Sequence, residues 1–252
     1  MTVLEASGVD FSYGKRPILT GVDLAVGTGQ SVGIVGESGA GKSTLLSLLL
    51  GLASPQRGEI RYDGAPLRLR DRALMRDFRS GVQAVFQDPY SSLDPRQRVD
   101  RIVAEPLESL GLAQGSQARE RVREALESVG LPADAAQRYP HEFSGGQRQR
   151  IAIARATVVR PRVLVADEPV SALDVSTRTQ VIELINRLRA EHGLALVMVS
   201  HDLGAVAATC ERTVVLEGGR VVEAGPTGTL LAAPREAYTQ RLISAIPRLP
   251  TS

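Results

Sequence analysis

The chain has 252 residues, of which 43% are hydrophobic and 23% are charged, the composition of a globular protein long enough for a large core. This excludes a disordered chain, a collagen-like repeat and, because Cys210 is the only cysteine, a disulfide scaffold. Its 30 basic and 28 acidic residues leave a net charge of +2, without the large basic field of a nucleic-acid-binding protein, so we expect no nucleic-acid partner. We also expect no secretory signal, because Met1–Asp10 has neither a basic nor an apolar region, and no membrane span, because no apolar run approaches about 18 residues.

The first part of the chain carries strand patterns. Residues 3–26 and 58–64 are typical of antiparallel strands, with a turn at Asp63-Gly64. Between them, the largely apolar run Ser31–Val35 predicts a buried strand that ends at a glycine loop. The leucine-rich stretch Ser43–Leu52 predicts the helix that follows this loop.

The stretch 88–157 differs, because it is polar and helical and has no strong strand pattern. One of its helices is followed by Gly130, a typical helix stop, and has an apolar stripe formed by Val122, Ala125, Leu126 and Val129. We interpret this stretch as a helical insertion between two parts of one core.

Two more apolar runs, Val163–Ala166 and Leu194–Val199, have no alternation and predict strands that are covered on both faces. A helix between them has its apolar stripe at Val181, Leu184, Ile185 and Leu188. A strand, a helix and a strand in this order imply a right-handed parallel crossover, so the fold class is α/β. We expect the sheet to end near Val222, with two short helices after it, the second ending at Ile246 before Pro247 and Pro250.

The strand at Ser31–Val35 leads into Gly36–Ser43, which has the spacing G-x-x-x-x-G-K-[ST] of a phosphate-binding loop. Its glycines allow backbone N–H groups to surround a phosphate, and the helix start adds positive charge. Lys42 is expected to reach the β- and γ-phosphates and Ser43 to ligate Mg²⁺. Lys42 is one of only two lysines among the 30 basic residues. The codon bias of a GC-rich genome accounts for this composition, but the motif is also a place where a compact ammonium fits and a planar guanidinium does not.

Two carboxylates, Asp167 and Glu168, follow the strand Val163–Ala166. A carboxylate at such a strand end can hold the Mg²⁺ that bridges the phosphates of a nucleoside triphosphate, and we assign this to Asp167. Glu168 is then expected to polarise the attacking water.

The segment Ser144-Gly145-Gly146-Gln147 reads as a capping box at the start of a helix. Each glycine in a first turn costs about 1 kcal/mol relative to alanine, so we expect that stability does not require them. Exposed N–H groups at this helix start suit an anion.

These motifs, in this order, resemble the ATPase subunit of an ATP-binding cassette transporter over Val3 to about Gly225; the fourth motif is Ser200-His201-Asp202. The resemblance implies a P-loop NTPase core of the RecA-like type, with an antiparallel β subdomain and an inserted helical signature subdomain. The whole chain, 1–252, would be a single cassette domain. It would comprise a core with the β subdomain (1–87 and 158–225), the helical subdomain (88–157) and a C-terminal helical tail (226–252).

The resemblance also implies roles for single residues. Tyr13 would stack on adenine, and Asp174 would lie across the dimer interface. Gln87 would contact Mg²⁺ and the water and sense the membrane partner, and His201 would contact the γ-phosphate. The helix start at Ser144 would close on the γ-phosphate bound to a second subunit. We therefore expect catalytic roles for Glu168, His201 and Gln87, metal ligation by Ser43, Gln87 and Asp167, and nucleotide binding by Tyr13, Gly36, Ser38, Gly39, Gly41, Lys42, Ser43, Thr44, Ser144, Gly145, Gly146, Gln147 and Asp174.

Three segments, Phe86–Pro95, Tyr139–Gln147 and Tyr238–Pro247, are similar to the peptide and nickel importer branch of this family. This implies an ATPase that powers uptake of peptides, nickel or a related solute from the cytoplasmic face of the cell membrane. The implied partners are a second ATPase subunit, identical or related, transmembrane permease subunits and, indirectly, a solute-binding protein. Longer members of the branch bind an iron–sulfur cluster through a cysteine-rich extension. With Cys210 alone, we expect no such cluster.

Two other classes of cassette protein do not fit this sequence. Lys42 and Asp167 lie 125 residues apart with no heptads between them, unlike DNA-repair cassettes, and the chain has one cassette where translation factors usually have two. A soluble assembly similar to phosphonate-breakdown machinery, and an exporter, both remain open at this point.

Overall fold

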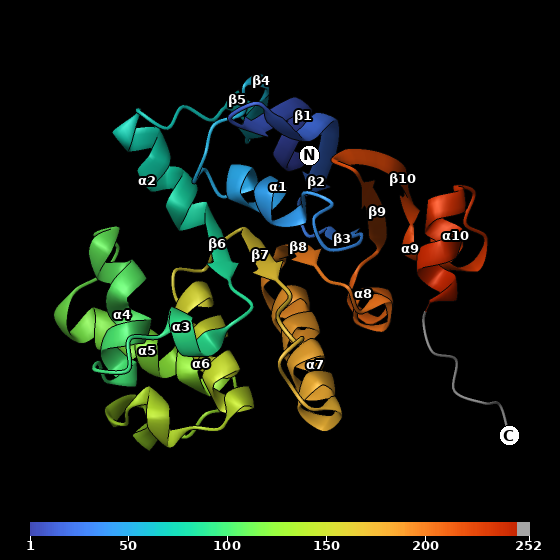
Figure 1. Ribbon diagram of the computed structural model, residues 1–252. Coiled ribbons are helices and arrows are strands. Elements are labelled where there is room, and N and C mark those ends of the chain that lie inside the picture. Colours follow the sequence, from blue (N-terminus) through green and yellow to red (C-terminus); the bar gives the residue numbers. More distant parts are fainter. Residues whose placement is uncertain (246–252) are drawn as a thin grey trace, which may run out of the picture. The chain divides into compact units, whose positions relative to one another are not determined.

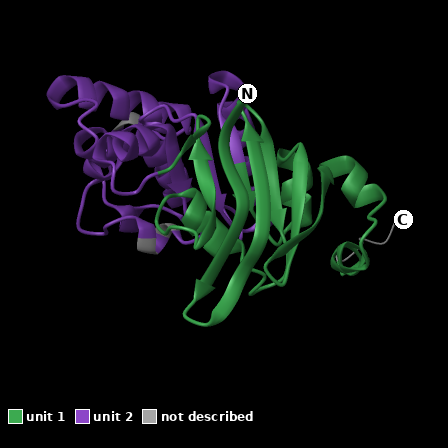
Figure 2. Cartoon of the chain, turned by 90° about the horizontal axis from the view of Figure 1, so that it is seen from above, with its two compact units in different colours: residues 1–67, 197–252 green, residues 68–196 purple. Residues whose placement is uncertain are grey.

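The structure is a computed structural model that describes residues 1–245, without the side chains of Pro89, Ser91 and Ala133. The chain divides into two compact units, residues 1–67 with 197–252 and residues 68–196, shown in green and purple in Figure 2. Among the described residues, no helix is both long and apolar enough to span a membrane.

The first unit contains an antiparallel sheet in the order β2-β1-β4-β5. Its strands are β1 (Thr2–Tyr13), β2 (Arg16–Gly27), β4 (Arg57–Tyr62) and β5 (Ala65–Pro66). The predicted turn joins β4 to β5, with Asp63 and Gly64 at φ values of 49° and 77°. The antiparallel strands predicted in this region are therefore confirmed.

The same unit contains a second set of strands, in which β3 lies between β9 and β8 and β10 pairs with β9. These strands are β3 (Ser31–Val35), β8 (Ala195–Val199, which crosses the boundary between the units), β9 (Arg212–Glu217) and β10 (Arg220–Pro226). The helices of the unit are α1 (Lys42–Leu49), α8 (Leu203–Thr209), α9 (Thr227–Ala232) and α10 (Ala237–Ser244), labelled in Figure 1.

Three predicted boundaries in this unit differ from the structure. Helix α1 ends at Leu49 and not at Leu52, because Gly51 adopts a φ of 63° just beyond it. Strand β10 continues past Val222 to Pro226. The prediction ended it too early, because its half-exposed side chains give no clear apolar pattern. The two short C-terminal helices are confirmed, whereas the predicted helix end at Ile246 and the prolines at 247 and 250 lie outside the described residues.

The second unit contains β6 (Val82–Val85) and β7 (Val163–Asp167), which pair in parallel. Strand β6 was not predicted, because Gln83 interrupts an already short apolar run. The remaining elements are helical: α2 (Arg72–Gly81), α3 (Pro89–Ser92), α4 (Val99–Ser109), α5 (Gly115–Ser128), the 3-10 helices η1 (Ala133–Gln137) and η2 (Pro140–Glu142), α6 (Gly145–Thr157) and α7 (Val175–His192).

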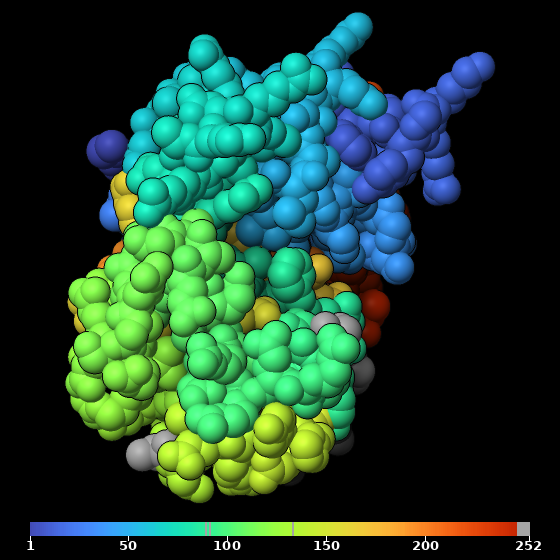
Figure 3. All heavy atoms as spheres, turned by 90° about the vertical axis from the view of Figure 1, so that its left-hand side faces the viewer, coloured from blue at the N-terminus to red at the C-terminus, as the bar shows by residue number. Residues whose placement is uncertain are grey.

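The predicted apolar stripes lie on the buried faces of their helices. In α7 the buried side chains are Val181, Leu184, Ile185 and Leu188, and the helix ends at Gly193 with a φ of 62°. In α5 they include Val122, Ala125 and Leu126. Residues 88–157, green to yellow-green in Figure 3, form helices and no strand in their described part.

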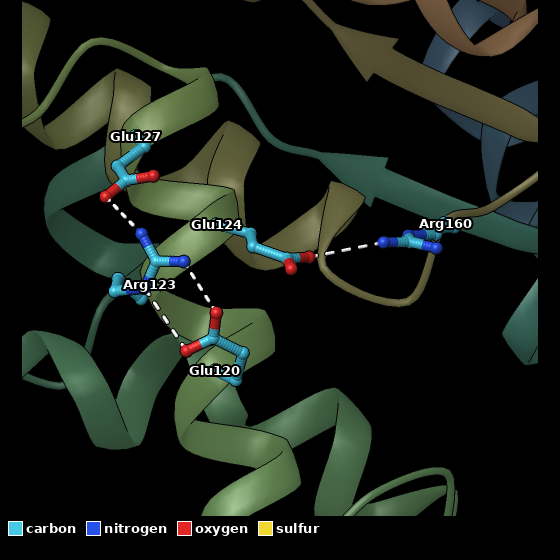
Figure 4. A network of polar contacts seen from close by, with 5 residues as sticks. All are labelled: Glu120, Arg123, Glu124, Glu127 and Arg160. Atoms are coloured by element: carbon cyan, nitrogen blue, oxygen red, sulfur yellow. Dashed lines mark hydrogen bonds and ion pairs between the residues drawn. The ribbon is translucent and has the colours of Figure 1, made fainter.

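The outer face of α5 carries ion pairs (Figure 4). Arg123 bonds to Glu120 and Glu127 on the same helix, and Glu124 pairs with Arg160 at 3.2 Å. The hydrogen bonds to Glu120 and Glu127 raise the pKa of the Arg123 guanidinium. The side chains are exposed to solvent, so the pairs contribute little to stability, and the packing of the apolar stripe holds α5 in place.

Gly33 lies in the middle of β3, where all five residues are buried. A Cβ atom at this position would meet Val206 Cγ1 of α8 at 2.6 Å and the buried Cys210 Sγ at 3.3 Å. Helix α8 therefore packs on β3 at a distance that only glycine allows.

We predict that Gly33→Ala lowers the free energy of unfolding by about 1–3 kcal/mol, because it overpacks a close-packed core. Val206→Ala should remove the clash, so the double variant should be more stable than the sum of the two single changes implies. Urea unfolding of the four proteins measures this coupling, and strictly additive effects would contradict the packing described here.

Candidate functional site

The loop Gly36–Ser43 joins β3 to α1 in the first unit, and two of its glycines are required by close contacts. A Cβ at Gly36 would lie 2.2 Å from the Leu216 carbonyl oxygen of β9. One at Gly41, where φ is 102°, would lie 2.7 Å from Leu19 Cδ2. The loop backbone therefore packs closely against β2 and β9.

The Lys42 side chain folds back into this loop. It is only 9% exposed, and its Nζ donates hydrogen bonds to the carbonyl oxygens of Gly36 and Glu37, both at 2.8 Å. Residues 37–39 and Ser43 are exposed. Helix α1 starts at Gly41 without a side-chain cap, so the positive end of its dipole faces the loop. A loop with exposed backbone, an ammonium and an uncapped helix start can bind a phosphate chain.

Two other predicted residues belong to the first unit. Tyr13 stands at the end of β1 with 62% of its surface exposed, and its ring meets Phe11 edge-on at 5.1 Å. An exposed ring can stack on a base. His201 is exposed in the turn between β8 and α8, next to Asp202, whose carboxylate caps α8 at 3.1 Å from the Ala205 nitrogen.

In the second unit, Asp167 is the last residue of β7 and Glu168 follows it. Glu168 has a φ of 45°, a left-handed conformation that costs a non-glycine residue about 1–3 kcal/mol. The Ser171 backbone N–H and hydroxyl both donate to its carbonyl oxygen, at 3.2 and 3.1 Å. This tight turn holds the Glu168 backbone, while its carboxylate accepts a hydrogen bond from Gln87 Nε2 at 3.2 Å.

The capping box predicted at Ser144 is confirmed. The Ser144 hydroxyl accepts from the Gln147 nitrogen at 3.3 Å, and Gln147 Oε1 accepts from the Ser144 nitrogen at 3.0 Å. Ser144 itself is exposed, Gly145 and Gln147 are half-buried, and Gly146 is buried.

The expectation that stability does not require the two glycines of this helix start is wrong for Gly146. A Cβ there would lie 2.2 Å from Thr177 Cγ2 of α7, whereas the nearest atom to a Cβ at Gly145 is Leu173 Cδ2 at 3.8 Å. The Thr177 side chain cannot easily turn away, because its hydroxyl donates to Asp174 Oδ2 at 2.7 Å.

Asp174 is the N-cap of α7. Its carboxylate accepts hydrogen bonds from the Ser176 hydroxyl at 2.6 Å and from the Thr177 nitrogen at 3.0 Å. These hydrogen bonds hold the pKa of Asp174 well below its usual range, so the group is a carboxylate at neutral pH. The structure thus gives Asp174 a capping role that the sequence analysis did not assign.

The structure brings together Gln87 with Glu168, and Gly146 with the Asp174–Thr177 turn. One residue near the phosphate loop was missed by the sequence analysis, namely Tyr238 of α10, whose hydroxyl lies 2.8 Å from the Glu37 nitrogen. The tail that carries Tyr238 was noticed only as similar to one branch of a family, and no local pattern could reveal a contact across 201 residues.

A pocket of about 700 Å³ lies in the second unit among α4, α5 and η1. It is lined by five arginines, by apolar side chains of α5 and by Tyr139. None of the predicted site residues lines it.

Comparisons with known proteins show which family this chain resembles. The family described as ABC transporter matches residues 19–171. A protein named as a peptide import ATP-binding protein from Brucella abortus (strain 2308) is 46% identical over 230 residues, which cover 91% of this chain and 73% of the relative. The glutathione import ATP-binding protein GsiA of Salmonella typhimurium is 47% identical over 219 residues, which are 87% of this chain but only 35% of GsiA.

Solved structures are similar in fold. CbiO1 from Clostridium perfringens, part of the ABC transporter complex cbiONQ, matches with a TM-score of 0.83 and 28% identity over 92% of this chain and 91% of its own. A dimeric ATP-binding cassette in a post-hydrolysis state with ADP and Pi matches with a TM-score of 0.77 and 32% identity, over 89% of this chain and 98% of its own. The expected α/β cassette fold is therefore confirmed.

We predict that Lys42→Arg, like Lys42→Ala, loses most ATP binding. The ammonium is nearly buried between two carbonyls, and a planar guanidinium is too large for that position. Titration with a fluorescent ATP analogue measures this, with Lys15→Arg as the matched control that should bind like the wild type. Wild-type affinity in Lys42→Arg would rule out the proposed use of this loop.

We predict that Gly146→Ala destabilises the second unit, whereas Gly145→Ala is neutral or stabilising, since alanine is the better helix former by about 1 kcal/mol. Thr177→Ser removes the clashing methyl group and keeps the hydroxyl, so it should restore stability to Gly146→Ala. Thermal unfolding of these variants is the measurement, and equal melting temperatures for the two single glycine variants would contradict the contact with Thr177.

Proposed function

This chain belongs to the ABC transporter family, and we propose that it is the ATP-hydrolysing subunit of an importer for peptides, nickel or a related small solute. Support for import comes from the relatives, which are named as peptide and glutathione import ATP-binding proteins. Support for hydrolysis comes from one observation above all, the hydrogen bond between Gln87 and the Glu168 carboxylate at the end of β7. In that pair the carboxylate can accept a proton from a water molecule and the amide can orient the carboxylate.

In the proposed reaction, the phosphate loop binds the phosphates of ATP through the backbone N–H groups of Gly36, Ser38, Gly39, Gly41, Lys42, Ser43 and Thr44. Lys42 neutralises the β- and γ-phosphates. Glu168 accepts the proton of the attacking water while the bond between the γ-phosphorus and the bridging oxygen breaks, which gives ADP and phosphate. Tyr13 stacks on adenine, and His201 contacts the γ-phosphate.

Mg²⁺ is proposed as the metal of this reaction, held by Ser43, Gln87 and Asp167 together with the phosphates. Hydroxyl, amide and carboxylate oxygens suit this cation, which usually takes only one or two carboxylates from the protein. Consistent with this, the described residues contain no group of three or more His, Cys, Asp or Glu that could hold a metal by themselves. When bound, Mg²⁺ neutralises charge that develops on the phosphates.

We further propose that two cassettes pair, and that the start of α6, with Ser144, Gly145, Gly146 and Gln147, meets the γ-phosphate held by the second subunit, with Asp174 at the interface. A solved relative is described as dimeric. The chain would then act as one domain, residues 1–252, with 88–157 as its helical subdomain. It would bind transmembrane permease subunits at the cytoplasmic face of the membrane and, through them, serve a solute-binding protein.

The importer assignment is tested by reconstitution with the permease subunits in vesicles. ATP turnover should rise when the solute-binding protein delivers its solute from the outer side. Solute-independent turnover, or solute movement in the outward direction, would instead favour a soluble assembly or an exporter.

We predict that Glu168→Gln binds ATP normally but hydrolyses it about 10²- to 10⁴-fold more slowly, because an amide keeps the shape of the side chain but cannot accept the proton. Binding titration and phosphate release under single-turnover conditions check both halves. Glu191→Gln, the same change on an exposed residue of α7, is the control. Wild-type hydrolysis by Glu168→Gln would show that another group activates the water.

A further inference from the structure

The C-terminal helix α10 contacts the phosphate loop through one buried side chain. Tyr238 is 5% exposed, and its hydroxyl accepts a hydrogen bond of 2.8 Å from the backbone nitrogen of Glu37. Both residues belong to the first unit, although 201 positions separate them. The contact therefore depends on the position of the tail and not on the local sequence of the loop.

The peptide group that Tyr238 contacts is also the one that Lys42 contacts. The Glu37 N–H and the Gly36 carbonyl belong to the same planar peptide unit. Tyr238 holds its N–H, and the Lys42 ammonium donates to its carbonyl oxygen at 2.8 Å. Because Gly36 is packed against the Leu216 carbonyl, the peptide has little freedom to shift, and any rotation of it would displace the acceptor of the Lys42 ammonium.

The tail is anchored at points other than Tyr238. Glu223 of β10 accepts hydrogen bonds from the backbone nitrogens of Arg235 and Glu236, at 3.0 and 3.2 Å, just before α10 begins. On α10, the Arg241 guanidinium lies 5.7 Å from the centre of the Tyr238 ring and 3.5 Å from Glu217 of β9. Burial raises the pKa of the Tyr238 hydroxyl, so it is uncharged at neutral pH and suited to a hydrogen bond with an amide.

We infer that Tyr238 is a positioning residue of the nucleotide site, which sets the peptide between Gly36 and Glu37 and through it the ammonium of Lys42. It does not touch the nucleotide itself. The inference rests on the proposed function, since it assumes that the loop binds ATP. Helix α10 contains none of the nucleotide-binding motifs, yet by this inference it supports the phosphate loop.

The test is Tyr238→Phe, which keeps the ring in its buried position and removes only the hydroxyl. ATP and ADP should both bind about 3- to 10-fold more weakly, the effect of one lost hydrogen bond, because both present a β-phosphate to the loop. The KM for ATP should rise by the same factor, while kcat at saturating ATP stays within about twofold. A general loss of structure would instead lower kcat and the melting temperature together.

Tyr62→Phe is the matched control. Tyr62 is 4% exposed on β4 of the antiparallel sheet, so the change removes a hydroxyl from an equally buried ring of the same unit. It should leave ATP affinity unchanged. Wild-type affinity in Tyr238→Phe, or an equal loss in Tyr62→Phe, would overturn the inference. A wild-type protein that does not bind ATP would overturn the proposed function instead, so the two failures are distinguishable.

Discussion

The ammonium of Lys42 lies almost out of solvent between two backbone carbonyls, and the first unit is built to keep those carbonyls in place. A buried cation is stable only where hydrogen-bond acceptors replace its lost water. Here the acceptors are backbone atoms, so their positions depend on the path of the chain. Close contacts of Gly36 with β9 and of Gly41 with β2 restrict that path. The hydrogen bond from Glu37 to Tyr238 of α10 restrains it further. The strands β2 and β9 matter to the site because they carry the contacts at Gly41 and Gly36.

In the second unit, side chains cap the starts of α6 and α7 and so fix the backbone there. Asp174 caps α7 and orients Thr177, and the methyl group of Thr177 then leaves no room for a side chain at Gly146. Gly146, buried in the first turn of α6, thus lets α6 and α7 pack closely. This close packing explains why a first-turn glycine is tolerated despite its cost in helix stability.

Glu168, the proposed catalytic carboxylate, has a strained backbone at the end of β7. Its left-handed backbone is unfavourable for a glutamate, yet two hydrogen bonds from Ser171 hold it there. The turn directs the carboxylate to the amide of Gln87, which follows the parallel neighbour β6. Such conformations persist only where the surrounding structure determines them, and they are frequent at sites that do chemistry.

The sequence by itself determined the elements whose signals are local. The phosphate loop, the Ser144 capping box and the stripe of α7 depend on spacings of a few residues, and each was predicted with its residues. Strand β6 and the course of β10 were missed, because Gln83 and the half-exposed residues of β10 break the short-range pattern. Only the tertiary structure decided that Gly146 is required by Thr177, that Asp174 caps α7 beside it, and that Tyr238 reaches Glu37. These contacts join residues distant along the chain, and their existence depends on distances of a few ångströms between packed elements, which no spacing within the sequence encodes.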